Sequence, residues 1–319
     1  MMQQILLGLG DSGPNVDVSE VFDITLYTGT GGTEGIDNDM DYTGGGMLWI
    51  KQRSANSRDN VIADTTQGIF QYLVSNNANG TQNNNNTVAG LNNDGFVVKG
   101  DMRVGESGRN FVAWTWLDAA NFFDHLQYRG NGNSSQSISH SLGASPGMIF
   151  IKRVGSGSHN WRVFHKDMGV DSYLELNDFD SENESESDIF PALPSSTTFT
   201  VGNDATVGAN GEDYMAYLFA DTAGVIKCGS YDGANTNKSV DCGFQPQFLM
   251  IKPYSGATGM WTVFDSTRGT TKQLRWESND AESTVDVLSF TSTGFTITGS
   301  TANHNGSGRK FIFMAIAAS

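Results

Sequence analysis

One unit of about 100 residues occurs three times in this chain, and this repetition limits the fold more than any other feature of the sequence. A short apolar run that ends in lysine recurs at Lys51, Lys152 and Lys252, at intervals of 101 and 100 residues. Each copy also opens with a Tyr-x-Gly motif, at Tyr27, Tyr128 and Tyr231. Solenoid repeats are about 20–50 residues long, so a period of this length indicates three small domains instead.

The register of the repeats sets the domain boundaries. We expect an N-terminal arm at residues 1–20, followed by repeats at 21–120, 121–222 and 223–319. The linkers between the repeats are short, and the first of them contains two phenylalanines that can be buried. The sequence therefore predicts domains that are packed against each other.

The arm contains an apolar run that a monomer would leave exposed. An exposed apolar segment at a chain terminus usually docks on another surface. The candidate docking residues are Ile5, Leu6, Leu7 and Leu9. The alternative is a frayed terminus.

Within each repeat the pattern is that of short β-strands. Residues 147–153 form an apolar run that ends in charge, residues 197–201 and 294–299 alternate, and residues 214–219 are apolar throughout. Gly, Asn or Ser bound these runs, and no stretch of twelve or more residues keeps a 3.6-residue period. A single helical turn is expected within residues 64–73. The prediction is an all-β chain of three tandem antiparallel β-sandwich-like domains.

Charge and composition exclude several classes of function. The formal net charge is −16, whereas nucleic-acid binding requires a basic face that releases counterions. Residues 1–10 have no basic region and only a very short apolar run, so neither a secretory signal nor a membrane span is expected. With only two cysteines, a disulfide scaffold or a four-thiolate metal site is excluded. We expect Cys228 and Cys242 to be buried thiols, with a cross-strand disulfide as the alternative.

Polar loops are the first candidates for recognition. They fall at the same place in each repeat, at residues 76–86, 177–188 and 278–283. Loops on rigid sandwiches often carry binding residues, although solvated loops without a specific role are the alternative. Candidate surface residues in the first loop are Asn84, Asn85 and Asn86.

Tryptophan is the second candidate for recognition, because an exposed indole can stack on a sugar. Five of the six tryptophans lie in apolar runs and are expected in the core. Trp276 stands between two charged residues and is therefore predicted to be exposed. Residues 37–41 alternate like a calcium loop, but Tyr42 stands where the turn glycine belongs, so no metal site is predicted. No cofactor is expected.

Catalytic motifs are sparse, and no enzymatic activity is predicted. No Gly-x-Ser-x-Gly elbow or His-Glu-x-x-His motif occurs. Asp64 and Asp265 are the one carboxylate pair considered for glycoside cleavage. His165 takes their position in the second repeat, which disfavours a shared catalytic role. Both aspartates are expected to cap the turns that follow them.

Several motifs together resemble a known module. They are Val263 to Gly269 (Val-Phe-Asp-Ser-Thr-Arg-Gly), Gly294-Phe295-Thr296, Val112-Ala113-Trp114 and Gly243 to Lys252. Within a repeat, the order is Tyr-x-Gly, an apolar strand that ends in Ile-Lys, Val-Phe-Asp-Ser-Thr-Arg-Gly, the Gly-Phe-Thr strand and a closing motif such as Val-Ala-Trp. This order is similar to that of a repeated β-rich module of virion structural proteins of tailed bacteriophages, often marine ones. The similarity spans residues 21–319. The second repeat departs most, with His165-Lys166-Asp167-Met168-Gly169 in place of Asp-x-x-Arg-Gly.

The resemblance implies a virion component and carries no catalytic residues with it. We expect a tail fibre or tail appendage protein, docked through its arm and exposing β-domains to the host surface. It would assemble in the host bacterial cytoplasm with other virion proteins, as a homo-oligomer for which a trimer is one option. A capsid decoration protein is the alternative within this class. A glycan-binding or glycan-cleaving module, with a host-surface glycan as partner, is the alternative of another class.

Overall fold

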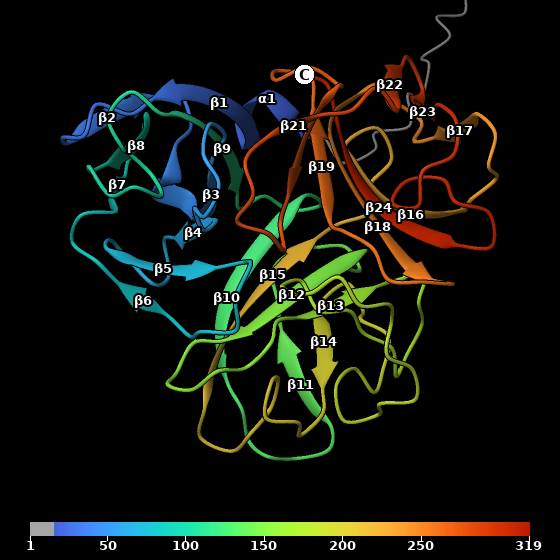
Figure 1. Cartoon of the computed structure of the whole chain (residues 1–319). Helices are drawn as coiled ribbons and strands as arrows, with labels where there is room; N and C mark the ends of the chain where they lie inside the picture. The colour runs from blue at the N-terminus through green and yellow to red at the C-terminus, as the bar shows by residue number, and fades with distance from the viewer. Residues whose placement is uncertain (1–15) are drawn as a thin grey trace, which may run out of the picture.

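The computed structural model describes residues 16–319, and nearly all regular structure in this range is antiparallel β-sheet (Figure 1). The predicted all-β fold with sandwich-like units is confirmed. Three lobes surround a common centre, with the first repeat on the left of Figure 1, the second at the bottom and the third on the right. No helix among residues 16–319 has the length and apolar character needed to cross a membrane.

The first repeat has two sheets, preceded by a short helix α1 (Val18–Val21). Its strands are β1 (Phe22–Thr28), β2 (Glu34–Asp37), β3 (Gly46–Gln52), β4 (Val61–Asp64), β5 (Gln71–Val74), β6 (Gln82–Asn83), β7 (Val88–Leu91), β8 (Gly95–Val98) and β9 (Asn110–Leu117), with a 3-10 turn η1 (Tyr42–Gly44) before β3. The large sheet has the order β1-β9-β3-β4-β5-β6, and the small sheet has the order β2-β8-β7.

The second and third repeats follow the same plan. The second contains β10 (Phe123–Arg129), β11 (Gln136–Ser139), β12 (Met148–Arg153), β13 (Arg162–His165), β14 (Thr198–Val201) and β15 (Asp213–Phe219). The third contains β16 (Ile226–Asp232), β17 (Lys238–Asp241), β18 (Pro246–Ser255), β19 (Thr262–Asp265), β20 (Lys272–Arg275), β21 (Ser283–Thr284), β22 (Leu288–Thr291), β23 (Gly294–Ile297) and β24 (Lys310–Ala317).

Strand order is shared between the repeats. The large sheets are β10-β15-β12-β13 and β16-β24-β18-β19-β20-β21, so each repeat pairs its first strand with its last and its last with the strand that carries the repeat lysine. The small sheets are β11-β14 and β17-β23-β22. In the second repeat Pro191 and Pro194 lie in the segment that corresponds to β7 and β22. Proline has no N–H for a ladder, which accounts for the missing third strand.

The Tyr-x-Gly motif has the same structural role in each repeat. The tyrosine hydroxyl donates to a backbone carbonyl in the loop before the last strand, at 2.6, 2.7 and 2.6 Å, in the pairs Tyr27–Val104, Tyr128–Val207 and Tyr231–His304. The glycine lies against the opposing backbone: a Cβ at Gly130 would come within 2.3 Å of the Ala209 carbonyl oxygen. The motif therefore recurs because a hydroxyl and the absence of a side chain are both required there.

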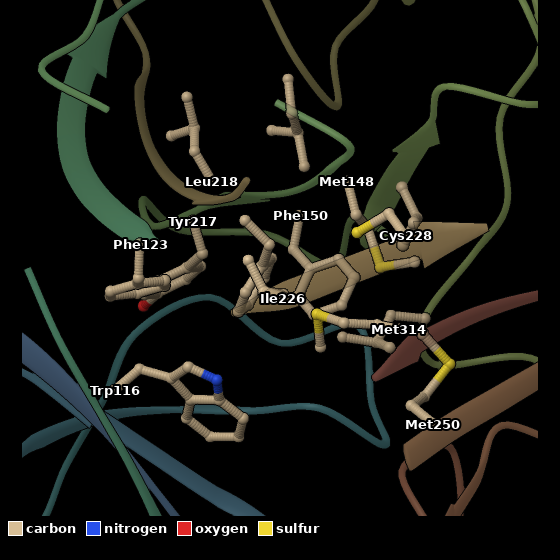
Figure 2. Close-up of a cluster of buried hydrophobic side chains, with 14 of the residues drawn as sticks. Trp116, Phe123, Met148, Phe150, Tyr217, Leu218, Ile226, Cys228, Met250 and Met314 are labelled. Carbon is tan, nitrogen blue, oxygen red and sulfur yellow. The ribbon is translucent and has the colours of Figure 1, made fainter. Parts of the chain in front are cut away.

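The larger of two hydrophobic clusters contains residues of all three repeats. Figure 2 shows Trp116 of the first repeat, Phe150 and Tyr217 of the second, and Met250 and Met314 of the third in one cluster. A second, smaller cluster belongs to the first repeat. The predicted packing of the repeats against each other therefore takes the form of a shared interior.

Two local expectations need correction. Residues 65–67 form a turn and not a helical turn, and Gly68 follows with a φ of 86°. Among residues 16–319 the one α-helix is α1, which begins within the expected arm and ends one residue beyond it. The Asp17 carboxylate caps it by accepting from Ser19 N at 3.0 Å, and Val18 is buried. The ordered fold therefore starts before residue 21. Ile5, Leu6, Leu7 and Leu9 lie outside the described residues.

Candidate functional site

The interfaces between the repeats form a closed ring. The residue just before β4, β13 or β19 donates to a carbonyl of a neighbouring repeat in each case. The pairs are Trp161 Nε1 to Val74 O at 3.0 Å, Trp261 Nε1 to Glu175 O at 2.9 Å, and Asn60 Nδ2 to Trp276 O at 3.3 Å. These contacts run from the second repeat to the first, from the third to the second, and from the first to the third. Head-to-tail contacts that close in this way generate a ring, here with pseudo-threefold symmetry.

The repeat lysines form a second set of ring contacts. Lys51 Nζ donates to the Ser278 carbonyl of the third repeat at 3.1 Å, and Lys152 Nζ to the Ala78 carbonyl of the first repeat at 2.8 Å. At the remaining interface Lys252 Nζ donates to the Gly259 carbonyl, and Gly259 N donates to Phe179 O of the second repeat at 2.7 Å. Ala78, Phe179 and Ser278 all belong to the polar loops. These loops therefore connect neighbouring repeats, a role that neither sequence-based interpretation anticipated.

Burial changes the acidity of all three lysines. It lowers the pKa of Lys51 and Lys252 to about 8, although nearby carboxylates oppose the shift. Burial together with the neighbouring Arg162 lowers the pKa of Lys152 to about 7. The ammonium groups are shielded from water and are bonded to backbone carbonyls, so they serve the interfaces and not a solvent-facing site.

Asp64 and Asp265 cap their turns, as predicted. Asp64 Oδ1 accepts from the backbone N–H groups of Thr66 and Gln67 at 3.0 and 2.7 Å, and Asp265 Oδ1 accepts from Arg268 N at 2.8 Å. Both aspartates are fully buried, and the other carboxylate oxygen of each bonds a neighbouring repeat. Neither carboxylate is placed to contact a sugar.

The exchange of Asp for His at residue 165 follows from its neighbour in the ring. Asp64 Oδ2 accepts from Tyr217 Oη at 2.7 Å, and Asp265 Oδ2 accepts from Trp114 Nε1 at 3.1 Å. Strand pairing places Met314 at the position equivalent to these donors, and a thioether has no hydrogen to donate. His165 is buried beside the Phe313 backbone, and burial lowers its pKa to about 4, so its imidazole is neutral.

A polar cluster holds the first link between repeats. His125 Nδ1 lies 2.7 Å from Asp118 Oδ1, and His125 Nε2 lies 3.0 Å from the exposed Thr66 hydroxyl. Burial opposes protonation of His125, but the bond and charge of Asp118 raise its pKa above the usual value. The arrangement resembles that of a hydrolase triad. However, the N–H groups of Thr66 and Gln67 are both committed to Asp64, so neither is free to stabilise an oxyanion. The cluster acts as a clamp between two repeats.

The prediction that Trp276 is exposed is wrong. Trp276 is 0% exposed, and its ring stacks on that of Trp49 with a centroid distance of 4.0 Å. Asn60 stands at the position of Trp161 and Trp261 in the other two repeats. At the interface between the first and third repeats, Trp276 therefore supplies an indole that Asn60 does not. The five tryptophans that were assigned to the core are also buried. The sequence shows that the first repeat lacks this tryptophan and that the third repeat has an additional one. The charged residues on both sides of Trp276 led instead to the prediction of an exposed side chain.

The remaining predicted residues have simpler environments. Asn85 and Asn86 are exposed, whereas Asn84 is half-buried: its amide donates to Asp101 Oδ2 at 2.8 Å and its carbonyl oxygen accepts from Asn86 N at 2.9 Å. Asn84 therefore holds the loop that presents the other two. Cys228 and Cys242 are buried free thiols, as expected, and burial raises the pKa of Cys242 to about 12.

A family model described as "Domain of unknown function (DUF7483)" matches residues 17–319, which includes α1 and all three repeats. No curated protein matches the chain.

Proposed function

The chain belongs to the DUF7483 family, a domain family of unknown function, and we propose that it is a non-enzymatic structural protein of a bacteriophage virion. The observation that carries this proposal is the closed ring. One polypeptide reproduces the arrangement of three head-to-tail subunits, and the hydrogen bonds that close the ring come from all three repeats. Such a ring suits attachment to an assembly that itself has threefold symmetry.

Further support comes from what the polar groups do. The conspicuous carboxylates, lysines and indoles of the repeats are buried and hold the interfaces, as Asp64, Lys152 and Trp261 illustrate. These residues include the motifs that resemble phage virion modules. The repeated sequence therefore serves architecture, which is the expected use of such motifs in a structural protein.

Within the virion we place the protein in a tail fibre or other tail appendage, docked through its N-terminal arm. A capsid decoration protein is the second candidate, and the ring itself favours it, because a pseudo-threefold chain suits a position between three like subunits. The glycan-binding alternative has lost its main residue, since Trp276 is buried. Asn85 and Asn86 are what remains of that candidate surface.

Electron microscopy of labelled virions tests the proposal. The label is best inserted in the exposed turn at residues 131–135, because β11 lies at the bottom of Figure 1 and the C-terminus at the top. An insertion there leaves the region around the arm unchanged. Label at the tail supports an appendage, and label over the head supports a decoration protein. If purified particles contain the chain at neither place, the virion proposal is wrong.

A further inference from the structure

One side of the ring carries the two linker segments that join the repeats along the chain. The turns after β4, β13 and β19 sit beside the starts of β3, β12 and β18 through the bonds Thr65 N to Gly46 O, Lys166 N to Gly147 O and Ser266 N to Gln247 O, at 3.1, 2.9 and 2.8 Å. The two linker segments lie on the same side. Asp118, in the first linker, donates its N–H to Gly45 O at 3.0 Å, and Asp221 Oδ2, in the second linker, lies 3.2 Å from Lys166 Nζ. We name this side the joint face.

The C-terminus and the start of the described residues, at Val16, also belong to the joint face. Ala318 N donates to Gln245 O at 2.7 Å, just before β18 begins. Val16 and Val18 line a hollow together with Ala318 and Ser319. The described part of the chain therefore begins, at Val16, on this face.

Exposed apolar side chains stand at equivalent positions on the joint face. Ile69 is 53% exposed and Val170 is 44% exposed. Each directly follows a glycine with positive φ, in the turn after β4 for Ile69 and in the turn after β13 for Val170. Thr270, half-buried, is the third member of the set. Equivalent positions in a closed ring lie on one circle around its axis, so the three turns face the same direction.

An apolar groove adds to this surface. It has a volume of about 350 Å³ and is lined by Ala144, Ser145, Pro146, Phe164, Lys166, Leu193, Pro194 and Asp221. Leu193, at 61% exposure, is the most exposed large apolar side chain in the described part of the chain. Contiguous apolar surface of this kind marks contact sites.

We propose that the joint face docks on a threefold-symmetric protein surface of the virion, with the turns at Ile69, Val170 and Thr270 placed on its three equivalent subunits. Three equivalent turns fit three equivalent sites on such a partner, and the described chain begins on the same face, at Val16. This inference rests on the proposed function and specifies the attachment surface and the symmetry of the partner.

Incorporation of variants into virions tests the proposal. The chain is supplied in trans as the full-length wild type, as the double variant I69D/V170D, or as the control M102D. Met102 is 51% exposed and lies at the opposite end of β3, where its carbonyl accepts from Gln52 Nε2 at 2.6 Å. Thermal unfolding of the purified proteins confirms that the substitutions at exposed positions preserve the fold.

We expect the double variant to be incorporated about tenfold less than the wild type, because an unpaired carboxylate in a buried contact is strongly disfavoured. The control should be incorporated normally, and density for one chain should sit on a threefold axis. Normal incorporation of I69D/V170D, or density away from every threefold axis, overturns this inference and leaves the proposed function intact. Absence of the wild type from particles overturns both.

Discussion

The hydroxyl of Tyr217, in the second repeat, donates to the Oδ2 atom of Asp64, in the first, at 2.7 Å, and both side chains are fully buried. Burial, together with the nearby Asp64 charge, raises the pKa of Tyr217 well above its usual value, so the phenol keeps its proton throughout the physiological range. The bond links a turn-capping carboxylate to the neighbouring repeat, and thereby couples local backbone geometry to closure of the ring.

Removal of this hydroxyl should weaken the fold. Tyr217→Phe preserves the aromatic ring that stacks on His125 and removes only the hydroxyl. The buried Asp64 carboxylate then has one donor fewer, which typically costs about 1–3 kcal/mol of unfolding free energy. Tyr254→Phe is the matched control, because Tyr254 is also buried but its hydroxyl has no hydrogen bond among residues 16–319. Denaturant unfolding measures both, and equal midpoints for the two variants would contradict the prediction.

His165 should make the protein less stable in mild acid. Its folded pKa of about 4 lies below the usual 6.5, so between these values the unfolded chain binds a proton that the folded chain does not. Stability therefore falls as pH decreases through this window, by up to about 1.4 kcal/mol per pH unit. His165→Gln should lack this loss.

The comparison between wild type and His165→Gln isolates this residue. His304, with its pKa also lowered to about 4, and Glu277, with its pKa raised to about 7, affect both proteins alike. Unfolding free energies at pH 7, 6, 5 and 4 provide the measurement. A constant difference between the two proteins across this range would mean that the pKa of His165 is the same in the folded and the unfolded chain.

The repeat lysines should resist chemical modification. Lys51, Lys152 and Lys252 are fully buried, whereas Lys310 is exposed. Brief acylation of the native protein at pH 8, followed by mass spectrometry of peptides, should modify Lys310 and spare the other three. Acylation in denaturant serves as the control, because all four should then react. Native modification of the three lysines at the rate of Lys310 would show that the interfaces open.

Trp276 should behave as a core residue. Trp276→Ala removes an indole that is stacked on Trp49, and truncation of a buried tryptophan typically costs about 3–5 kcal/mol. The control is Asn85→Ala at an exposed position, which should leave stability unchanged. Thermal unfolding distinguishes the two. A Trp276→Ala protein as stable as the wild type would indicate that the indole is exposed and would contradict the prediction.

The turn glycines should be required for their backbone conformation. Gly169 has a φ of 89°, with nothing within 4 Å of an added Cβ, so Gly169→Ala tests conformation without a clash. A side chain in this region costs about 1–2 kcal/mol. Gly44→Ala is the matched control, since Gly44 also has open space around it but not a positive φ. Unfolding midpoints that coincide for these two variants would rule out a conformational requirement.

Much of the strand pattern could be predicted locally. Residues 197–201 and 214–219 read as strands from their side chains alone, and both are strands in the structure, with the first starting one residue later and the second one residue earlier. The caps at Asp64 and Asp265 were equally readable, because a carboxylate bonds backbone N–H groups two and three residues away. Trp276 was not, because its indole is buried against residues that are distant in sequence, such as Trp49 of the first repeat, on which it stacks.

The sequence by itself determined the period, the β class and the equivalence of positions, since these follow from side-chain alternation and from spacing along one chain. The tertiary structure decided which repeat each repeat contacts. A pattern such as Asp64, His165 and Asp265 reads as simple tolerance until Tyr217, Trp114 and Met314 are seen opposite. Hydrogen-bond donors and acceptors are matched in space, and only a folded chain brings residues 150 positions apart within reach of each other.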